Sequence, residues 1–473
     1  MHRKPFRFCP RCGTALRPIV EHGVRRRACP ACGWIWYRNP VPAAGAILVR
    51  GGEVLLVNFA GEETDFVRFN RAQVRQPMSV RQAQLTLSLI ESGRRNNVTV
   101  TLSGDPSQDR ARVADAIGAL RAELDALPAD PYLLYATEAT ASDREDRGRL
   151  PSPAEAVEQI TAAARGTDLV GLLASGPIYR GFANSFGSRH WHAVDASLLD
   201  WSLYHAADKA VKCAWATSRW DAAELARRID EGRAQLVHLA KPARTIDPGE
   251  YRVYLAPAAV DELTQMLNWG GVSAKAQRTK QSCLQKLVDG EATLSPLVSV
   301  REDTAGGLAP AFDEAGFTRP PSVALIEQGR HAGSLVSPRT AKEYGIETNG
   351  AGEDEAMQSM AMDGGLLPES HALSALDTGL AIGNLHYLNF SDRPGGRITG
   401  LTRFATFWVE QGKIVAPVNV MRFDDTLYRM LGSNLEALTR EPQWTMDTRT
   451  YGARSVQTSR VPGALLARMA FTL

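Results

Sequence analysis

The sequence lacks the features that would place the protein in a membrane or outside the cell. It contains no run of about 18 apolar residues, the length needed to cross a bilayer. Its basic N-terminus has no apolar segment of the kind found in secretory signal peptides. We therefore expect a cytoplasmic protein with no membrane partner.

Cysteine is scarce, with six in 473 residues. Four of them lie between Cys9 and Cys32, whereas Cys213 and Cys283 stand alone. This distribution is not that of a disulfide framework, and it fits a reducing compartment. We expect Cys213 and Cys283 to be ordinary buried residues.

Neither sign of charge dominates, because 54 Lys and Arg stand against 52 Asp and Glu. The basic excess is confined to residues 1–40, where nine Lys and Arg accompany one acid, Glu21. The rest of the chain has 45 basic and 51 acidic residues. A polyanion could therefore bind only through the N-terminal piece, and we do not expect a nucleic-acid partner.

The clearest motif is a double CxxC, formed by Cys9, Cys12, Cys29 and Cys32. Sixteen residues separate the two pairs, which is the spacing of a zinc ribbon. Four thiolates close a tetrahedral shell around Zn²⁺ and leave no position for water or substrate, so we predict a structural zinc site in residues 1–40. A redox CxxC is the alternative, and two matched pairs argue against it.

Residues 1–57 are similar to the start of Nudix hydrolases of the NADH-pyrophosphatase type. The stretches that carry the resemblance are "CPRCG" and "CPACGWIWYRNPVPAAGAILVRGGEVLLV", with a hairpin expected at 41–57. The resemblance implies a later box of glutamates that bind catalytic metal ions. That box is absent, since "SDREDRG" and "REDTAGG" lack its trailing Glu-Glu pair. A Nudix-type nucleotide pyrophosphatase remnant is therefore an alternative hypothesis only.

Helices and strands are both predicted behind this start, so the fold class is α+β. Apolar residues recur at helical spacing in 107–128. Residues 152–166 open with Ser152, Pro153 and Glu155, which predict a capping box. Alternating residues in 85–101 predict an antiparallel hairpin.

The second half is richer in predicted strands. A strand at 249–255 precedes a helix that Pro257 opens and Gly270-Gly271 ends. Further strands lie between long Gly- and Pro-rich loops. We predict two domains, 58–240 and 241–473, behind the ribbon and the short hairpin.

Six stretches between about 60 and 440 carry a resemblance to a known family. They are "DFVRFNRAQVRQ", "GLLASGPIYRGFANSFGSRHWH", "DKAVKCAWATSRW", "GLAPAFDEAGFTRP", "LVSPRTAKEYG" and "LHYLNFSDRPGGRITGLTRFATFWVEQGKIVAPVNVMRFDDTLYRMLG". Through them the body of the chain resembles the TldD/PmbA family, which is associated with zinc-dependent peptide hydrolysis. The resemblance implies a two-domain body.

The resemblance also implies which kind of subunit this is. TldD-like members carry His-Glu-x-x-x-His on a helix, where two imidazoles bind zinc and the Glu serves as general base. The corresponding helix has Thr264, Gln265 and Trp269 at those positions, and none of the nine histidines is followed by Glu. The chain therefore resembles the TldE (PmbA) kind, which implies a non-catalytic subunit, a heterodimer with a TldD-like partner that holds the catalytic zinc, and small or unfolded peptides as substrates.

Candidate substrate-binding residues lie in the last and longest of these stretches: His386, Asp392, Arg393 and Arg403. Arg can hold peptide carboxylates, and an extended peptide can add to a sheet edge. A buried network that holds the loops is an equally good interpretation of these residues. His190 and His192 share a strand face and could chelate a metal, although without a third ligand a polar strand face is the simpler interpretation.

One further alternative concerns the ribbon itself. Arg25, Arg26 and Arg27 follow one another between the two CxxC pairs, so residues 1–40 could serve as an interaction module for nucleic acid or protein. A solvated turn is the simpler interpretation of these arginines.

Overall fold

The computed structural model describes residues 9, 14–21, 24–33, 35–36, 52–206 and 209–472. The chain divides into two compact units, Met1–Ile47 and Leu48–Leu473. Each unit has its own secondary structure and is described by itself.

The first unit contains a three-stranded antiparallel sheet in the order β1-β2-β3. Leu16 is buried beside Cys9 and Cys29, which form the small apolar cluster of this unit. A sheet with buried cysteines agrees with the predicted small ribbon. The strands are β1 (Arg17–Glu21), β2 (Val24–Ala28) and β3 (Ile35–Trp36).

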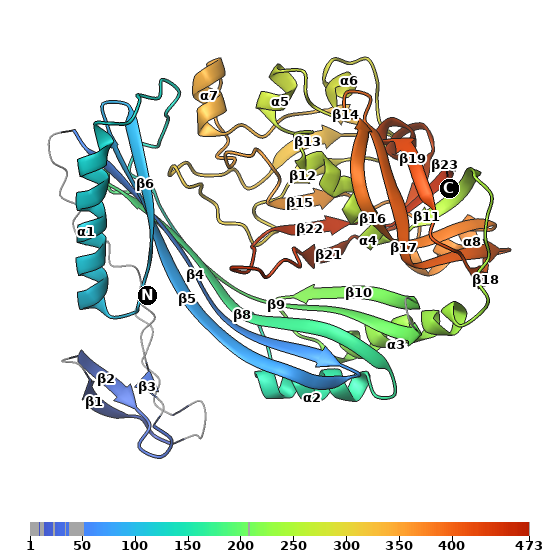
Figure 1. Ribbon diagram of the computed structural model, residues 1–473, viewed down its shortest axis with the longest axis horizontal. Helices are drawn as coiled ribbons and strands as arrows, with labels where there is room; N and C mark the ends of the chain where they lie inside the picture. The colour runs from blue at the N-terminus through green and yellow to red at the C-terminus, as the bar shows by residue number, and fades with distance from the viewer. Residues whose placement is uncertain are drawn as a thin grey trace. The chain divides into compact units, whose positions relative to one another are not determined.

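A seven-stranded sheet forms the first half of the second unit, in the order β10-β9-β8-β4-β5-β6 with β7 added beside β9. Figure 1 shows its long strands curving past both the upper helix α1 and the lower helices α2 and α3. Strands of 17 to 19 residues extend about 60 Å. One sheet of this length can contact several other elements along its course. The strands are β4 (Val54–Asn70), β5 (Gln73–Glu91), β6 (Arg94–Thr101), β7 (Ala141–Asp146), β8 (Asp168–Asn184), β9 (Arg189–Ala206) and β10 (Lys209–Thr217).

The predicted hairpin and helices of this half are confirmed. Leu85 pairs with Val100 and Leu87 with Val98 across β5 and β6. Helix α1 (Pro106–Leu124) buries Leu120 and Leu124. Helix α2 (Pro153–Ala163) has the capping box between Ser152 and Glu155, and with α3 (Ala222–Leu239) it covers an apolar face of the sheet.

Residues 136–153, whose polar sequence suggests an exposed linker, also contain a strand. Strand β7 pairs in parallel with β9, from Ala141–Arg189 to Asp146–Val194. Most of its side chains are exposed, as the polar sequence suggested. The strand was missed because pairing at a sheet edge needs only backbone groups, which leave no apolar signal in the sequence.

Two of the predicted domain limits can be located on these elements. The limit between residues 57 and 58 falls inside β4, which runs unbroken from Val54 to Asn70, while the other strand of the expected hairpin lies outside the described residues. The limit at 240 falls directly after α3 and inside the second unit. The division of that unit into two domains stays a prediction.

The second half contains two mixed sheets. In one, the pairings β11–β16, β16–β17, β17–β19, β19–β23 and β23–β11 return to the starting strand and close a ring. The other has the order β14-β13-β12-β15-β22-β21. The strands are β11 (Gly249–Leu255), β12 (Val300–Glu302), β13 (Val323–Glu327), β14 (Arg330–His331), β15 (Ser359–Met362), β16 (Gly379–Asp392), β17 (Arg397–Glu410), β18 (Lys413–Pro417), β19 (Arg422–Thr426), β20 (Leu435–Leu438), β21 (Gln443–Met446), β22 (Thr458–Val461) and β23 (Ala464–Phe471).

Short helices connect and cover these sheets, as the predicted long loops allow. The helix expected after Pro257 is present and continues through a 3₁₀ turn to Trp269. The helical elements are α4 (Pro257–Gln265), η1 (Met266–Asn268), α5 (Ala274–Arg278), α6 (Gln285–Val288), α7 (Pro338–Tyr344), η2 (Glu369–His371), α8 (Ala372–Leu376) and η3 (Arg429–Ser433).

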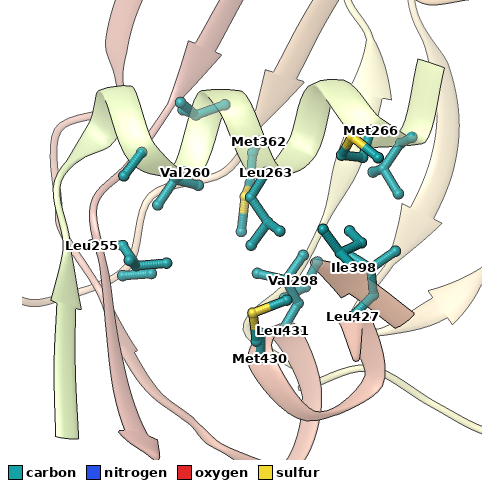
Figure 2. Packing of buried hydrophobic residues seen from close by; sticks show 14 of the residues in the cluster. Leu255, Val260, Leu263, Met266, Val298, Met362, Ile398, Leu427, Met430 and Leu431 are labelled. Carbon is teal, nitrogen blue, oxygen red and sulfur yellow. The ribbon is translucent and has the colours of Figure 1, made fainter. Parts of the chain in front are cut away.

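Helix α4 lies over the main apolar core of this half. Figure 2 shows Val260 and Leu263 of α4, and Met266 of η1, projecting towards the core that contains Val298 and Met430. All five are buried members of one cluster, which spans both sheets. This core fixes the axis of α4 and therefore the direction of its remaining side chains.

The two halves meet where residues 303–320 lie against the concave sheet. The ring of His190 stacks on Phe312 with centroids 5.0 Å apart, and Arg144 donates to the carbonyl oxygen of Gly307 at 3.0 Å. Arg454 reaches the same sheet from the C-terminal segment. Among the helices described, none is long and apolar enough to cross a membrane.

Candidate functional site

Three of the four predicted zinc ligands gather in the first unit. The sulfur atoms of Cys9, Cys29 and Cys32 lie within 4.8 Å of one another, and Cys9 Sγ is 3.5 Å from Cys32 Sγ. Thiolates at about 2.3 Å from a tetrahedral ion are about 3.8 Å apart, so this spacing suits a metal. Cys12, the predicted fourth ligand, lies outside the described residues.

The backbone explains why the cysteines meet. The amide of Gly33 donates to the carbonyl oxygen of Cys29 at 3.0 Å, and Gly33 has φ +71°, so the chain turns tightly around Cys32. The amide of Cys9 donates to the carbonyl oxygen of Thr14 at 2.7 Å. Within the part of the chain that the structure describes, no other His, Cys, Asp and Glu side chains gather in this way.

The helix that the family resemblance singled out is α4, and its polar side chains are engaged locally. Thr264 is fully buried, and its hydroxyl donates to the carbonyl oxygen of Val260 at 2.9 Å. Gln265 donates to Asp261 at 3.2 Å and accepts from Asn268 at 2.8 Å. Trp269 is 47% exposed. These three side chains offer no thiolate, imidazole or carboxylate to a metal.

Two carboxyl groups of α4 are held away from water. Burial raises the pKa of Glu262 to about 8, and the nearby carboxylate of Asp261 acts in the same direction. The hydrogen bond that Glu262 accepts from the Leu385 amide opposes this rise. Burial also raises the pKa of Asp261, which accepts from Ser459 Oγ at 2.6 Å. Glu262 thus connects α4 to β16, and Asp261 connects it to β22. Both carboxyl groups therefore hold the helix against its neighbouring strands.

The four predicted substrate-binding residues all lie on the β16–β17 hairpin, but in two places. His386 and Arg403 lie where the strands pair through Leu385 and Thr402. Asp392 and Arg393 lie at the turn, where Asp392 accepts from the Gly395 amide at 3.2 Å. All four side chains are exposed, so the alternative of a buried network does not describe them.

The hairpin is strained at two bulky residues that the sequence did not single out. Tyr387 and Phe404 both have φ +54°, a left-handed conformation that costs about 1–2 kcal/mol for a residue with a side chain. The pairing register of β16 and β17 shifts beside each of them. Tyr387 is 79% exposed, and its ring contacts that of His386 edge to face with centroids 4.6 Å apart. No pattern in the sequence marks a left-handed tyrosine.

His190 and His192 do share a strand face, but three of their four ring nitrogens contact groups of the fold, and His192 Nδ1 is buried without a hydrogen-bond partner among the described residues. The ring of His190 is bonded to Thr140 at 3.0 Å and to Ser142 at 2.8 Å. His192 Nε2 is 2.9 Å from the carbonyl oxygen of Leu308, and burial lowers the pKa of His192 to about 4. Among the described residues they gather no third ligand.

Comparison with known families identifies the second half. Residues 248–472 match the family described as PmbA/TldA metallopeptidase C-terminal domain. The second half of the chain is therefore similar to this C-terminal domain. The match begins one residue before β11 and includes both mixed sheets of the second half. Comparison with curated proteins gave no match.

Similarity to solved structures extends over both halves of the second unit. TldE from Thermococcus kodakarensis has a TM-score of 0.74 at 15% identity, with 89% of this chain and 97% of that chain covered. A proposed modulator of a DNA gyrase from Thermotoga maritima has a TM-score of 0.70 at 15% identity, with 89% and 96% covered. A proposed gyrase modulator from Bacteroides thetaiotaomicron gives 0.70 at 14%, with 89% and 94% covered. This chain therefore has the same fold as these structures, and the predicted α+β class is confirmed.

Proposed function

We propose that the chain is a TldE-like, non-catalytic subunit of a cytoplasmic zinc-dependent peptidase complex, whose catalytic zinc is held by a TldD-like partner. The observation that carries the proposal is α4. At the positions where the resemblance places His-Glu-x-x-x-His, this helix has a buried threonine, a glutamine bonded to its own helix, and a half-exposed tryptophan. The likeness to TldE from Thermococcus kodakarensis supports the same assignment.

Activity with and without the partner tests this proposal. The purified chain should not cleave an unfolded peptide, and the partner with this chain should co-elute from size-exclusion chromatography and cleave it. A chelator should abolish that cleavage, because the catalytic metal polarises the scissile carbonyl and activates water. The partner alone is the control. Strong chelator-sensitive cleavage by this chain alone would show that the proposal is wrong.

The second element of the proposal is that the cysteine cluster holds one structural zinc. Cys9, Cys29 and Cys32 supply three thiolates, and Cys12 is the proposed fourth ligand. Four thiolates leave no open position, so the ion would stabilise the fold of the ribbon rather than act on substrate.

Metal analysis checks this site. We expect one zinc per chain by mass spectrometry of the metal content, and its loss in Cys9→Ser and Cys29→Ser because each removes one ligand. Cys213→Ser is the matched control, since Cys213 lies on β10 and outside the cluster. A zinc ion that remains after Cys29→Ser would indicate a second site and contradict the non-catalytic assignment.

The third element is that peptides contact the exposed β16–β17 hairpin through His386, Asp392, Arg393 and Arg403. Arginines can pair with peptide carboxylates in two parallel hydrogen bonds. Because the four residues lie in two places, at the strand pairing and at the turn, they would contact different parts of one extended peptide.

A further inference from the structure

An exposed tryptophan and the turn of a distant hairpin meet at the end of α4. Trp269 follows η1, and its ring is perpendicular to that of Phe390 on β16, with centroids 6.3 Å apart and an interplanar angle of 70°. The guanidinium carbon of Arg393 lies 5.2 Å from the centre of the Phe390 ring. We call Trp269, Phe390 and Arg393 the hairpin anchor.

The hairpin anchor is held rigidly although it faces solvent. Phe390 packs partly against the main core, so its ring cannot swing away. The amide of Gly396 donates to the carbonyl oxygen of Arg393 at 2.9 Å and fixes the turn that carries Arg393. Trp269 nevertheless leaves 47% of its surface exposed. A half-exposed indole that already contacts Phe390 is a surface on which another ring can pack.

The charge of the anchor is not neutralised within the fold. Within the described ranges, neither Arg393 nor Arg403 lies within ion-pair distance of a carboxylate, whereas Arg397 on the same hairpin is 2.6 Å from Asp424. Both unpaired guanidinium groups lie over aromatic rings, Arg393 over Phe390 and Arg403 over Phe404 at 5.2 Å. Stacking leaves the edges of a guanidinium free to donate to a carboxylate.

We propose that the hairpin anchor binds an aromatic side chain of an unfolded peptide that carries a carboxylate within one or two residues. The peptide ring packs against Trp269 and Phe390, and the carboxylate pairs with Arg393. The inference rests on the proposed peptide contact of the β16–β17 hairpin and adds its sequence preference. The sequence singled out Trp269 only as the residue at a zinc-ligand position of TldD-like members, and it did not single out Phe390.

Peptide binding by the purified full chain tests this preference. Four dye-labelled unfolded peptides of equal length are titrated by fluorescence anisotropy: one with Tyr next to Asp, one with Ala for Tyr, one with Asn for Asp, and one with Lys for Asp. We expect the Tyr-Asp peptide to bind about tenfold more tightly than the Ala peptide, the effect typical of losing one buried aromatic contact. Raising the salt concentration should weaken the Tyr-Asp peptide more than the Asn peptide, because salt screens exposed charges.

Variants of the chain then locate the effect. Trp269→Ala and Arg393→Gln should each weaken binding of the Tyr-Asp peptide by about five- to tenfold. Two matched controls should leave it unchanged: Tyr451→Ala removes an exposed ring from another loop, and Arg397→Gln removes the ion-paired arginine of the same hairpin. Arg393→Gln alters only a surface side chain, so it remains informative even if Trp269→Ala folds poorly.

Three results would contradict the proposed binding preference of the hairpin anchor. They are equal binding of all four peptides, tighter binding of the Lys peptide, and no peptide binding by the chain. These three results say nothing about whether the chain co-elutes with a TldD-like partner or whether the pair cleaves peptides. Those two measurements test the proposed subunit role separately. Failure of co-elution with a retained Tyr-Asp preference would instead remove the subunit assignment and leave the anchor in place.

Discussion

His192 shows how the environment of one residue decides its chemistry. Its side chain is 1% exposed between the long sheet and residues 303–320. Burial lowers its pKa to about 4, the nearby guanidinium of Arg144 acts in the same direction, and the bond to Leu308 opposes both. The imidazole is therefore neutral in the folded chain at pH values where an exposed histidine carries a proton.

This depressed pKa predicts a pH dependence of stability. Between pH 6.5 and about 4 the unfolded chain binds a proton at His192 that the folded chain does not, so stability falls as the pH falls through this window. A shift of this size corresponds to about 3 kcal/mol. In His192→Gln this part of the pH dependence should disappear from urea unfolding curves measured between pH 4 and 7.

The control for this prediction is His205→Gln, because His205 is exposed in the folded chain. Its pH profile should follow that of the unaltered protein. Equal pH profiles for His192→Gln and the unaltered protein would contradict the assigned role of burial.

At the same scale, the cysteines were the residues best predicted from sequence. A CxxC pair places two sulfur atoms on one turn, so local spacing alone brings Cys29 and Cys32 together. His386, Asp392, Arg393 and Arg403 lie on one segment of the sequence, but their separation into two places depends on the register of β16 and β17.

The element that departs most from regular geometry is the β16–β17 hairpin. Tyr387 and Phe404 adopt positive φ on neighbouring strands, beside shifts of register. Because Tyr387 is 79% exposed, burial of its ring does not offset the strain of its backbone. Strained residues of this kind concentrate at functional sites, which agrees with a binding role for the hairpin.

Replacement of this tyrosine by glycine should stabilise the fold. Tyr387→Gly removes the clash of a side chain in the left-handed region, and we expect the free energy of unfolding to rise by about 0.5–1 kcal/mol. Tyr387→Ala is the matched control, since it removes the ring but keeps a Cβ atom. If both variants unfold at the same urea concentration, strain at this position is not the cause.

Local signals predicted the regular elements well. The capping box of α2 and the apolar residues of α1 are both present where the sequence placed them. The pairing of β5 with β6 follows the expected alternation. Strand β7 was missed because its polar residues pair at a sheet edge through backbone groups only.

Across the whole of the second unit, Arg454 joins the last segment of the chain to the first long sheet. It is 3% exposed and donates to the carbonyl oxygens of Gly176 at 3.0 Å and Ala196 at 2.8 Å. Burial lowers the pKa of Arg454 to about 10, and the buried carboxylate of Glu62 opposes this. One guanidinium thus satisfies oxygens on two strands, β8 and β9.

Removing the guanidinium group of Arg454 should destabilise the second unit as a whole. Arg454→Met removes the hydrogen bonds to two carbonyl oxygens and the favourable charge interaction with Glu62, so the free energy of unfolding should fall by about 3 kcal/mol. Arg449→Met, an 80% exposed arginine of the same segment, should change it by less than about 0.5 kcal/mol. Equal urea midpoints for the two variants would contradict the role of Arg454.

By itself, the sequence determined features that depend on nearby residues: the cysteine turns, the capped helices, the alternating strands, and the lack of any His-Glu pair. Only the tertiary structure decided that Trp269 meets Phe390, since 120 residues of folded chain separate them. It also decided that α4 would use Asp261 and Glu262 to hold β22 and β16. Such contacts depend on strand register and on the core beneath α4, which arise from many distant residues acting together.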